Sequence, residues 1–358
     1  MACGTGYSSP IAWEDRVFLL HRIGDEERVS CLNANTGESV WDQRYPTTFV
    51  CGSHYSNGPY STPATDGTSL FTLGAQGQLR CWALADGSLM WSRDLQEEFQ
   101  VPSGIFGVGH SPLIWNGLLI LNVGGTTADS GIIAFDCLNG AIVWQTTAHG
   151  AAFATPRPAR IHGRDWLFVL HREGLSLLNP LTGEEHWCLA FQPTIPDSAN
   201  AVTPLVSGDV VMISAWGLGS KALQIDPAGG YSELWSSRRN LVSQYTPLLA
   251  IGGSVLGVHA LDNSLRCVDL QSGDIRWRWK SELGNAKAIS IGNRVVLFGE
   301  YGHLGLIMSN TERLVELCVA PEPLLGAGER CYSAPAYAAG RLYLRSESEL
   351  LCLDLAGP

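Results

Sequence analysis

The chain has 358 residues, of which 45% are hydrophobic and 16% charged, and its formal net charge is −11. This acidic balance excludes a general nucleic-acid-binding protein and a protein that binds anionic membranes, because both need clustered Lys and Arg. No apolar run reaches the roughly 18 residues of a transmembrane helix, and 40 Gly, 18 Pro and 12 Trp favour an all-β fold.

One strand–turn–strand pattern recurs along the chain. Each copy has a short apolar strand, a tight turn that contains Gly, and a second strand that carries Trp. The Gly supplies the positive φ that a hairpin turn needs, and the Trp is suited to packing between neighbouring sheets. The six clear copies end at Trp41, Trp91, Trp144, Trp187, Trp235 and Trp277, and two weaker copies follow, LGLIMSNTERLVEL and LLCLDLAGP.

A second pattern precedes each copy of the first. It is a short segment with Pro, followed by a polar turn and a β-rich strand such as RVFLL or SLFTL. The Pro positions are Pro10, Pro63, Pro112, Pro156, Pro204, Pro247 and Pro335, with Ala288 in the Pro slot of the seventh copy. The full unit is therefore four strands, which is typical of a propeller blade. The sequence predicts an eight-bladed β-propeller of four-stranded antiparallel blades, in a single domain over residues 1–358.

The last blade is expected to be incomplete. Its third strand, Leu350 to Asp354, ends four residues before the C-terminus, and the first strand of the first blade begins close to Met1. Either this blade has three strands or the sequence lacks natural N-terminal residues. An exposed third strand offers unpaired N–H and C=O groups to another chain. We therefore expect an edge-strand dimer or a loop that covers the edge.

The repeat consensus A-x-D-x-x-T-G-x-x-x-W resembles the PQQ-like (quinoprotein alcohol dehydrogenase-like) propeller repeat, including that of outer-membrane assembly lipoproteins, over the whole chain. The assembly-lipoprotein branch implies binding of partner proteins without chemistry. Quinoprotein dehydrogenases resemble this chain in the Trp motif alone, since they carry a vicinal cysteine pair and Ca²⁺ ligands around the quinone. No cofactor is therefore expected, and PQQ with Ca²⁺ is the alternative.

The cysteines and histidines follow the repeat register. Cys31, Cys81, Cys267 and Cys352 share one strand slot that elsewhere holds residues such as Ala134, so they behave as small buried hydrophobes and all ten cysteines are expected to be reduced. His21, His171 and His259 also share one slot, on blades that are not neighbours, and cannot converge on zinc. Cys51 and His54 form an isolated CxxH, too little for a site. No metal site is predicted.

The long loops all lie on one face of the predicted propeller. The hairpin turns are short, whereas the connections at residues 44–60, 93–110, 189–202 and 319–332 are long. Binding residues concentrate on such loops, so the funnel on this face is the predicted site. The alternative is that the loops simply cover the mouth of the barrel.

Two repeat slots supply the candidate residues. The slot before the Pro holds a hydroxyl residue in six copies but Lys287 in the seventh, and a buried lysine needs a partner. Glu300 is either its structural ion-pair partner or half of a ligand-binding or catalytic pair. Two positions earlier lie four aromatic residues that form an apolar rim or pack between blades. The funnel candidates are Tyr7, Tyr60, His110, Phe153, Trp216, Tyr245, Lys287, Glu300, Arg330 and Tyr332.

Three functions fit these residues. The first is a module that binds a small molecule or a protein segment in the funnel. The second is an enzyme with acid/base chemistry around Lys287 and Glu300, and the third a PQQ-dependent dehydrogenase. The start MACGTGYSSP has no signal-peptide pattern. The protein is therefore expected in the cytoplasm as written, or in the periplasm or exported if the N-terminus is truncated.

Overall fold

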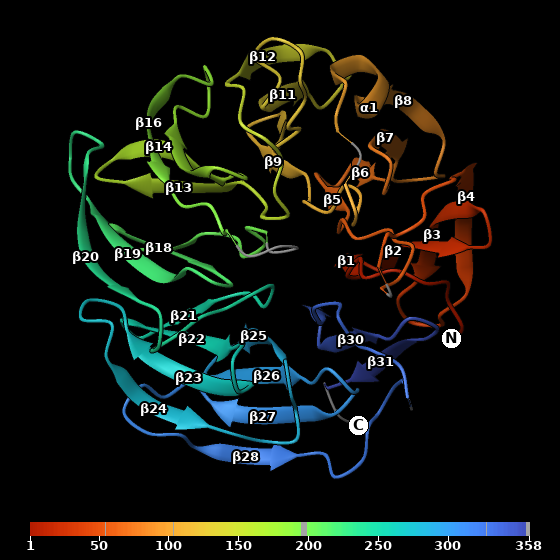
Figure 1. Cartoon of the computed structure of the whole chain (residues 1–358). Helices are drawn as coiled ribbons and strands as arrows, with labels where there is room; N and C mark the ends of the chain where they lie inside the picture. The colour runs from red at the N-terminus through yellow and green to blue at the C-terminus, as the bar shows by residue number, and fades with distance from the viewer. Residues whose placement is uncertain (54, 103, 195–198, 327, 356–358) are drawn as a thin grey trace. The chain divides into compact units, whose positions relative to one another are not determined.

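The computed structural model describes residues 1–358 except 54, 103, 195–198, 327 and 356–358. Its strands form eight antiparallel sheets that follow one another along the chain (Figure 1). Seven sheets have four strands and one has three. Within the described residues the only helix is α1, Leu95–Phe99. The fold is an eight-bladed β-propeller with an incomplete last blade, as predicted.

The chain divides into two compact units. The first comprises Met1–Ala148 and Pro323–Pro358, and the second His149–Glu322. The complete blades of the first unit are blade 1, with β1 Ile11–Trp13, β2 Arg16–Ile23, β3 Glu26–Asn33 and β4 Ser39–Pro46; blade 2, with β5 Ala64–Thr65, β6 Ser69–Leu73, β7 Gln78–Ala83 and β8 Leu89–Asp94; and blade 3, with β9 Leu113–Trp115, β10 Leu118–Leu121, β11 Ile132–Asp136 and β12 Ile142–Thr146. Its incomplete blade 8 has β29 Ala336–Ala338, β30 Arg341–Arg345 and β31 Leu350–Asp354.

The second unit holds four complete blades. They are blade 4, with β13 Arg157–Ile161, β14 Arg164–Leu170, β15 Gly174–Leu178 and β16 Glu185–Ala190; blade 5, with β17 Leu205–Ser207, β18 Val210–Ala215, β19 Gly219–Ile225 and β20 Tyr231–Ser237; blade 6, with β21 Leu249–Ile251, β22 Ser254–His259, β23 Ser264–Asp269 and β24 Ile275–Trp279; and blade 7, with β25 Lys287–Ile291, β26 Arg294–Phe298, β27 Leu304–Met308 and β28 Glu316–Val319.

Burial along the strands follows their position in the blade. Second strands such as β6 and β18 are buried at every residue, because both faces of the sheet pack against neighbours. Fourth strands alternate between exposed and partly buried residues, as β16 does. In every complete blade the register between third and fourth strands shifts at one place. In blade 1 Ser39 pairs with Leu32, and Trp41 pairs with Cys31. The exposed Val40 between them is the extra residue of the bulge.

The repeated indoles bond the next blade of the same unit. Trp41 Nε1 donates to the carbonyl of Leu84 at 3.2 Å, and Trp235 Nε1 to that of Leu270 at 2.9 Å. The same bond joins Trp91 to Cys137, Trp187 to Gly229 and Trp277 to Asn310. Trp41, Trp144 and Trp235 are buried and the other three repeat indoles are half-buried. These contacts explain why the repeat needs a large flat side chain with one donor.

All ten cysteines are free, as predicted. Cys31, Cys81 and Cys267 are fully buried in their shared slot, whereas Cys352 in blade 8 is exposed. His54 of the CxxH pair lies outside the described residues.

The N-terminal residues pair with the beginning of β31 (Figure 1). The Met1 amino group donates to the Leu350 carbonyl at 2.7 Å, Leu350 N–H donates to Met1, and Cys3 N–H donates to Ser348. Beyond Leu350, no described residue forms a fourth strand on β31. None of the helices in the described part of the chain has the length and apolar character needed to span a membrane.

Arg345 is a fully buried cation that the sequence analysis missed. Its guanidinium donates to the backbone carbonyls of Gly4, Thr5, Ser8 and Leu20. A buried cation is tolerated when several oxygens replace its water shell. The hydrogen bonds of Arg345 therefore hold the N-terminal segment against blade 8.

Candidate functional site

Hydroxyl side chains in the slot before the first strands accept hydrogen bonds from backbone N–H groups. Ser9 N–H donates to Thr62 Oγ1 at 3.1 Å, and Thr62 N–H donates to Ser111 Oγ at 2.9 Å. The second unit repeats the bond, from Thr155 N–H to Thr203 Oγ1 at 3.2 Å. In these three pairs the hydroxyl accepts the N–H of the preceding blade's slot residue, which gives a structural reason for its repetition.

Three of the ten candidates meet in the first unit. The rings of Tyr7 and Tyr60 lie 5.8 Å apart between centroids, and Tyr332 meets Tyr7 edge-on at 5.0 Å. Residues from two long loops extend the group. The ring centroid of Tyr55 lies 6.2 Å from that of Tyr332 and 5.7 Å from that of Phe106. The Phe49 ring lies 6.2 Å from the Tyr60 ring between centroids. We call Tyr7, Phe49, Tyr55, Tyr60, Phe106 and Tyr332 the aromatic cluster.

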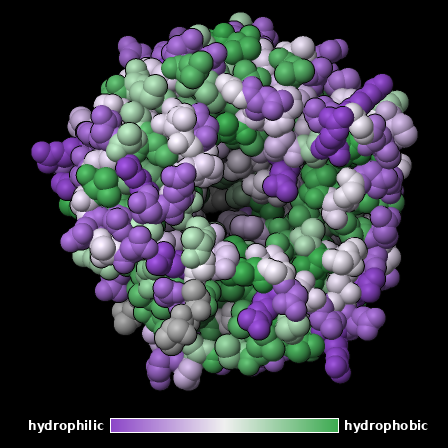
Figure 2. Space-filling view, turned by 180° about the vertical axis from the view of Figure 1, so that it is seen from behind, coloured by the Kyte–Doolittle hydropathy of each residue, from purple (hydrophilic) through white to green (hydrophobic). Residues whose placement is uncertain are grey.

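Large apolar side chains are exposed around this cluster. Hydrophobic residues are scattered among hydrophilic ones over the face seen in Figure 2. Beside the aromatic cluster, by contrast, several exposed apolar side chains lie on two loops that are hydrogen-bonded to each other. Val50 is 71% exposed, Ile105 46% and Tyr55 37%. Gly52 N–H donates to the Ile105 carbonyl at 3.0 Å, which ties the two loops together.

Hydrogen bonds hold the aromatic cluster in place. Tyr7 Oη accepts from Ser56 N–H at 3.0 Å, and Tyr60 Oη donates to the Ser56 carbonyl. The buried Arg22 guanidinium donates to the carbonyls of Phe49 and Asn57, at the two ends of the loop. Burial raises the pKa of both Tyr7 and Tyr60, so the phenols stay protonated. The result is an ordered aromatic surface whose phenols are neutral.

The other two candidates of this unit lie differently. His110 is 1% exposed, burial lowers its pKa to about 4, and its Nε2 has no hydrogen-bond partner within the described part of the chain. It is a neutral buried ring. Arg330 is exposed.

Lys287 and Glu300 share Asn285 as a common neighbour. Lys287 is buried, its Nζ donates to the Asn285 carbonyl at 3.1 Å, and it lies 5.3 Å from the centre of the Tyr245 ring. Asn285 N–H donates to Glu300 Oε2 at 3.4 Å, and its amide donates to Tyr245 Oη at 2.7 Å. Thr246 Oγ1 donates to Asn285 Oδ1 at 2.6 Å. The structure thus brings Tyr245, Lys287 and Glu300 together around a residue that the sequence analysis did not select.

Phe153 and Trp216, the remaining candidates of the second unit, are half-buried. Phe153 N–H donates to the Asn200 carbonyl at 3.0 Å.

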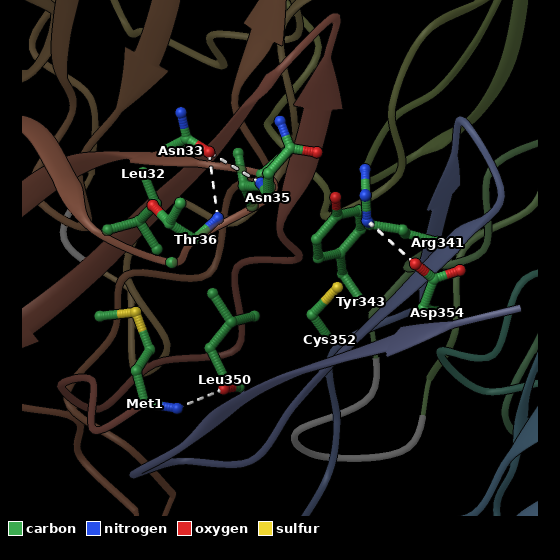
Figure 3. A pocket seen from close by; sticks show the side chains of 13 residues that line it. Met1, Leu32, Asn33, Asn35, Thr36, Arg341, Tyr343, Leu350, Cys352 and Asp354 are labelled. Carbon is green, nitrogen blue, oxygen red and sulfur yellow. Dashed lines mark hydrogen bonds and ion pairs between the residues drawn. The ribbon is translucent and has the colours of Figure 1, made fainter. Parts of the chain in front are cut away.

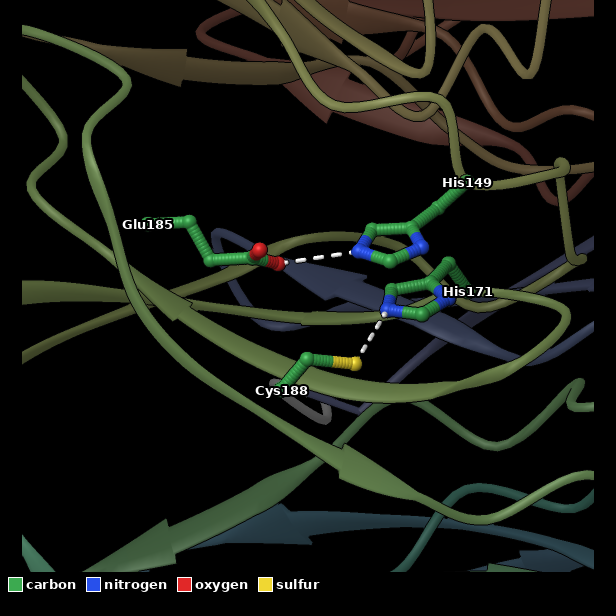
Figure 4. A group of neighbouring side chains, drawn as sticks. All are labelled: His149, His171, Glu185 and Cys188. Atoms are coloured by element: carbon green, nitrogen blue, oxygen red, sulfur yellow. Dashed lines mark hydrogen bonds and ion pairs between the residues drawn. The ribbon is translucent and has the colours of Figure 1, made fainter.

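A second polar group in this unit surrounds His171 (Figure 4). His149 stacks on His171 with 3.9 Å between ring centroids and 4° between planes. His149 Nε2 lies 3.0 Å from Glu185 Oε1, and Cys188 Sγ lies 3.5 Å from His171 Nε2. The possible ligand atoms of His149, His171, Glu185 and Cys188 all lie within 4.8 Å of one another. The repeat register relates His171 only to the histidines of its own slot, so it gives no sign of these neighbours from other slots.

A pocket of about 430 Å³ lies along the open edge of blade 8 (Figure 3). Val17, Leu32, Tyr343 and Leu350 line it with apolar atoms, and the turn at residues 33–37 faces β31 across it. Met1 closes one end through its bond to Leu350.

The repeats, the eight blades and the docked indoles can be compared with known proteins. The family model described as outer membrane protein assembly factor BamB matches residues 25–279, which is most of the chain. The chain belongs to this family. A BamB relative from Yersinia pestis is 27% identical over 251 residues, 65% of this chain and 58% of the relative. The chain spans about half the length of the curated BamB relatives it matches.

Solved structures agree on the fold. BamB from Moraxella catarrhalis superposes with a TM-score of 0.68 at 17% identity, covering 98% of this chain and 95% of that one. A quinohemoprotein alcohol dehydrogenase from Pseudomonas putida HK5 superposes with a TM-score of 0.52 at 12% identity, covering 96% of this chain and 70% of that one. At these identities the likeness shows the propeller fold alone.

Proposed function

We propose that this protein is a protein-binding scaffold that acts in outer membrane protein assembly, and that it binds its partner through the aromatic cluster. The observation that carries the proposal is the group of exposed apolar side chains, Val50, Tyr55 and Ile105, on two loops held by hydrogen bonds. Relatives named as outer membrane protein assembly factors support the assembly role.

The chemistry of the cluster suits a protein partner. Exposed groups of aromatic and aliphatic side chains mark interaction sites, and Tyr is enriched among the residues that contribute most to binding. Because Arg22, Tyr7 and Tyr60 already order the loop, little entropy is lost when a partner binds. The expected partner offers an uncharged, apolar protein segment.

The enzyme alternative has less support. Lys287 and Glu300 are both buried, and each side chain hydrogen-bonds to the backbone of Asn285. A polar cluster of this kind stabilises a blade without any substrate. The quinone alternative rests on fold likeness, which says nothing about a cofactor.

Three further predictions belong to this proposal. The family relationship favours the periplasmic or exported location over the cytoplasmic one. The repeat continues without a break across the boundary between the two units, which favours one propeller domain. The open edge of β31 can pair with another chain, and the mass of the protein in solution tests that pairing.

Complementation tests the assembly role. The chain, directed to the periplasm by an added secretion signal, is expressed in a bacterium that lacks its own BamB, and folded outer membrane proteins are quantified. We expect the wild type to restore their amount. Failure of the wild type, when it is folded and exported, would contradict the assembly role.

Variants test the surface separately. Ile105→Asp places a charge on the exposed residue before Phe106, beside the aromatic cluster, and should abolish most of the restored amount. Leu138→Asp is the matched control, because Leu138 is also exposed, on a turn of the same unit. Equal activity of both variants would exclude the aromatic cluster as the binding surface while leaving the assembly role intact. Thermal unfolding of each variant confirms that the fold is kept.

A further inference from the structure

The group around His171 combines four potential metal ligands from three segments of the second unit (Figure 4). His149 lies in the segment before β13, His171 follows β14, and Glu185 and Cys188 lie on β16. Figure 4 shows the Glu185 carboxylate and the Cys188 sulfur on the Nε2 side of the two stacked rings. Cys188 is exposed and His149 and Glu185 are half-buried, so an ion can reach the group from solvent.

The repeat accounts for only part of this group. In blade 1, His21 Nε2 lies 2.9 Å from Ser30 Oγ, and Ser30 Oγ donates to Asp42 Oδ2 at 2.6 Å. In blade 4, His171 Nε2 lies 2.9 Å from Ser176 Oγ, which donates to Glu185. The same histidine–serine–carboxylate chain of hydrogen bonds therefore occurs in both blades.

Two members of the group are particular to blade 4. The residue after the repeat Trp is Cys188, where blade 1 has Asp42 and the other blades with this Trp have Ser92, Gln145, Ser236 and Arg278. His149 adds a second imidazole against the first. A hydrogen-bonded His–Ser–carboxylate chain, as blade 1 shows, needs neither the thiol nor the second imidazole.

A carboxylate lies on the opposite side of the rings. Glu173 Oε2 is 3.2 Å from His171 Nδ1 and 4.0 Å from His149 Nδ1, and it accepts Gly150 N–H at 2.9 Å. Histidines that bind metal usually give their other ring N–H to a carboxylate, which orients the ring and increases its basicity. Glu173 lies within reach of His171 Nδ1, which without metal accepts the N–H groups of Glu173 and Gly174 at 3.2 Å each.

We propose that His149 Nε2, His171 Nε2, the Glu185 carboxylate and Cys188 Sγ bind one divalent transition-metal ion of the zinc class. Two imidazoles, one thiolate and one carboxylate are ligands that Zn²⁺ takes in four-coordinate sites. The thiolate and the carboxylate together balance the charge of the ion. The bound ion joins the segment that carries His149 to β16.

Binding changes protons and ring orientation in a defined way. The Cys188 thiol loses its proton to solvent when its sulfur binds the ion. Each imidazole that binds through Nε2 carries its proton on Nδ1, so the Nε2 proton moves to Nδ1 in both His149 and His171. At His171 a hydrogen bond from Nδ1 to the Glu173 carboxylate then replaces the two backbone N–H bonds that Nδ1 accepts without metal. The parallel rings must also turn toward each other, because the Nε2 lone pairs of stacked imidazoles do not point to one position.

Titration with Co²⁺ and Zn²⁺ under reducing conditions tests the proposal on the whole chain. We expect one equivalent of Co²⁺ to bind with a thiolate-to-metal absorption band, Zn²⁺ to displace it, and Zn²⁺ to raise the thermal unfolding temperature. Binding should release a proton.

Variants separate a metal site from a hydrogen-bonded cluster. Cys188→Ser should remove the absorption band, and His149→Gln should abolish stoichiometric binding. Glu173→Gln should weaken binding by roughly 10–100-fold, as for other residues that orient a ligand. Cys318→Ser is the matched control, because Cys318 is also an exposed cysteine on a fourth strand of this unit, and it should change nothing.

Two results would overturn the proposal. One is the absence of stoichiometric binding by the folded wild type. The other is binding that Cys188→Ser and His149→Gln leave unchanged. Either result would leave a metal-free cluster in which His149 bonds Glu185. Thermal unfolding without metal shows whether each variant is folded, so that loss of binding is not confused with loss of structure.

Discussion

Blades 1 and 8 share a third-strand pattern, VSCLN and LLCLD, but differ at the outer edge. In blade 1, β4 covers that edge, Trp41 pairs with Cys31, and the cysteine is fully buried. In blade 8, no fourth strand covers residues 351–353 within the described chain, and Cys352 is exposed. The burial of this slot is therefore produced by the fourth strand and its indole rather than by the strand that carries the cysteine.

The turns that receive the indoles show the same difference. A Cβ built on Gly87 would lie 2.6 Å from the Trp41 ring, and one on Gly140 would lie 2.8 Å from the Trp91 ring. A Cβ on Gly37 would meet nothing within 4 Å. Gly37 belongs to the turn that lines the pocket beside blade 8 (Figure 3). That pocket is thus the place that an indole fills at the junctions of blades 1 and 2 and of blades 2 and 3.

Removing the indole from an occupied junction should have the largest effect. We expect Trp41→Ala to lower the free energy of unfolding by about 3–5 kcal/mol, as for other large aromatic truncations in cores. Its neighbour Val40, which is 45% exposed, provides the control, and Val40→Ala should cost less than about 1 kcal/mol. Urea unfolding measures both. A loss for Trp41→Ala no greater than that for Val40→Ala would show that the indole does not stabilise the junction.

A pair of glycine substitutions measures the contact itself. Gly87 and Gly37 have φ of 74° and 73°, so Ala at either position costs the same backbone strain. Only the Gly87 methyl meets an indole. We expect Gly87→Ala to destabilise the protein by about 1–3 kcal/mol more than Gly37→Ala, the usual cost of overpacking. Equal losses in urea unfolding would mean that the turn of blade 1 is as crowded as that of blade 2.

The fold could be predicted because its information is local and repeated. Six blades carry a turn glycine and a Trp, and blades 7 and 8 repeat the strand pattern without the Trp, so eight imperfect copies support one another. The incomplete last blade was predicted from the short tail after Leu350. Arg345 was missed because a single arginine at a strand end carries no signal of burial, and the carbonyls of Gly4 and Ser8 that satisfy it lie far away in sequence.

The sites could be predicted only in part, because loops bring residues together without a repeat. The repeat slots identified Tyr7, Tyr60 and Tyr332, but nothing in the sequence placed Tyr55 and Phe106 beside them. The metal-ligand group was missed for the opposite reason. Its members depart from the repeat, and a search for departures in blade 4, rather than for histidines in one slot, would have found Cys188.

The smallest expected effect concerns His21, where blade 8 has Ser346 at the corresponding position. His21 accepts Gly4 N–H at Nδ1, and burial, with the charges of Arg345 and Arg28, lowers its pKa to about 4. An unfolded histidine titrates near 6.5. Between these values the unfolded chain binds more protons than the folded one, so the free energy of unfolding rises with pH from about 4 to 6.5. His21 alone should lower the free energy of unfolding by about 1 kcal/mol when the pH falls from 6.5 to 5.5.

His110 and His171, whose pKa values burial also lowers to about 4, add to the same slope. His21→Gln should therefore flatten the slope without removing it. Urea unfolding at several pH values measures these slopes. A His21→Gln slope equal to that of the wild type would show that blade 1 gains no pH dependence from the residue that distinguishes it from blade 8.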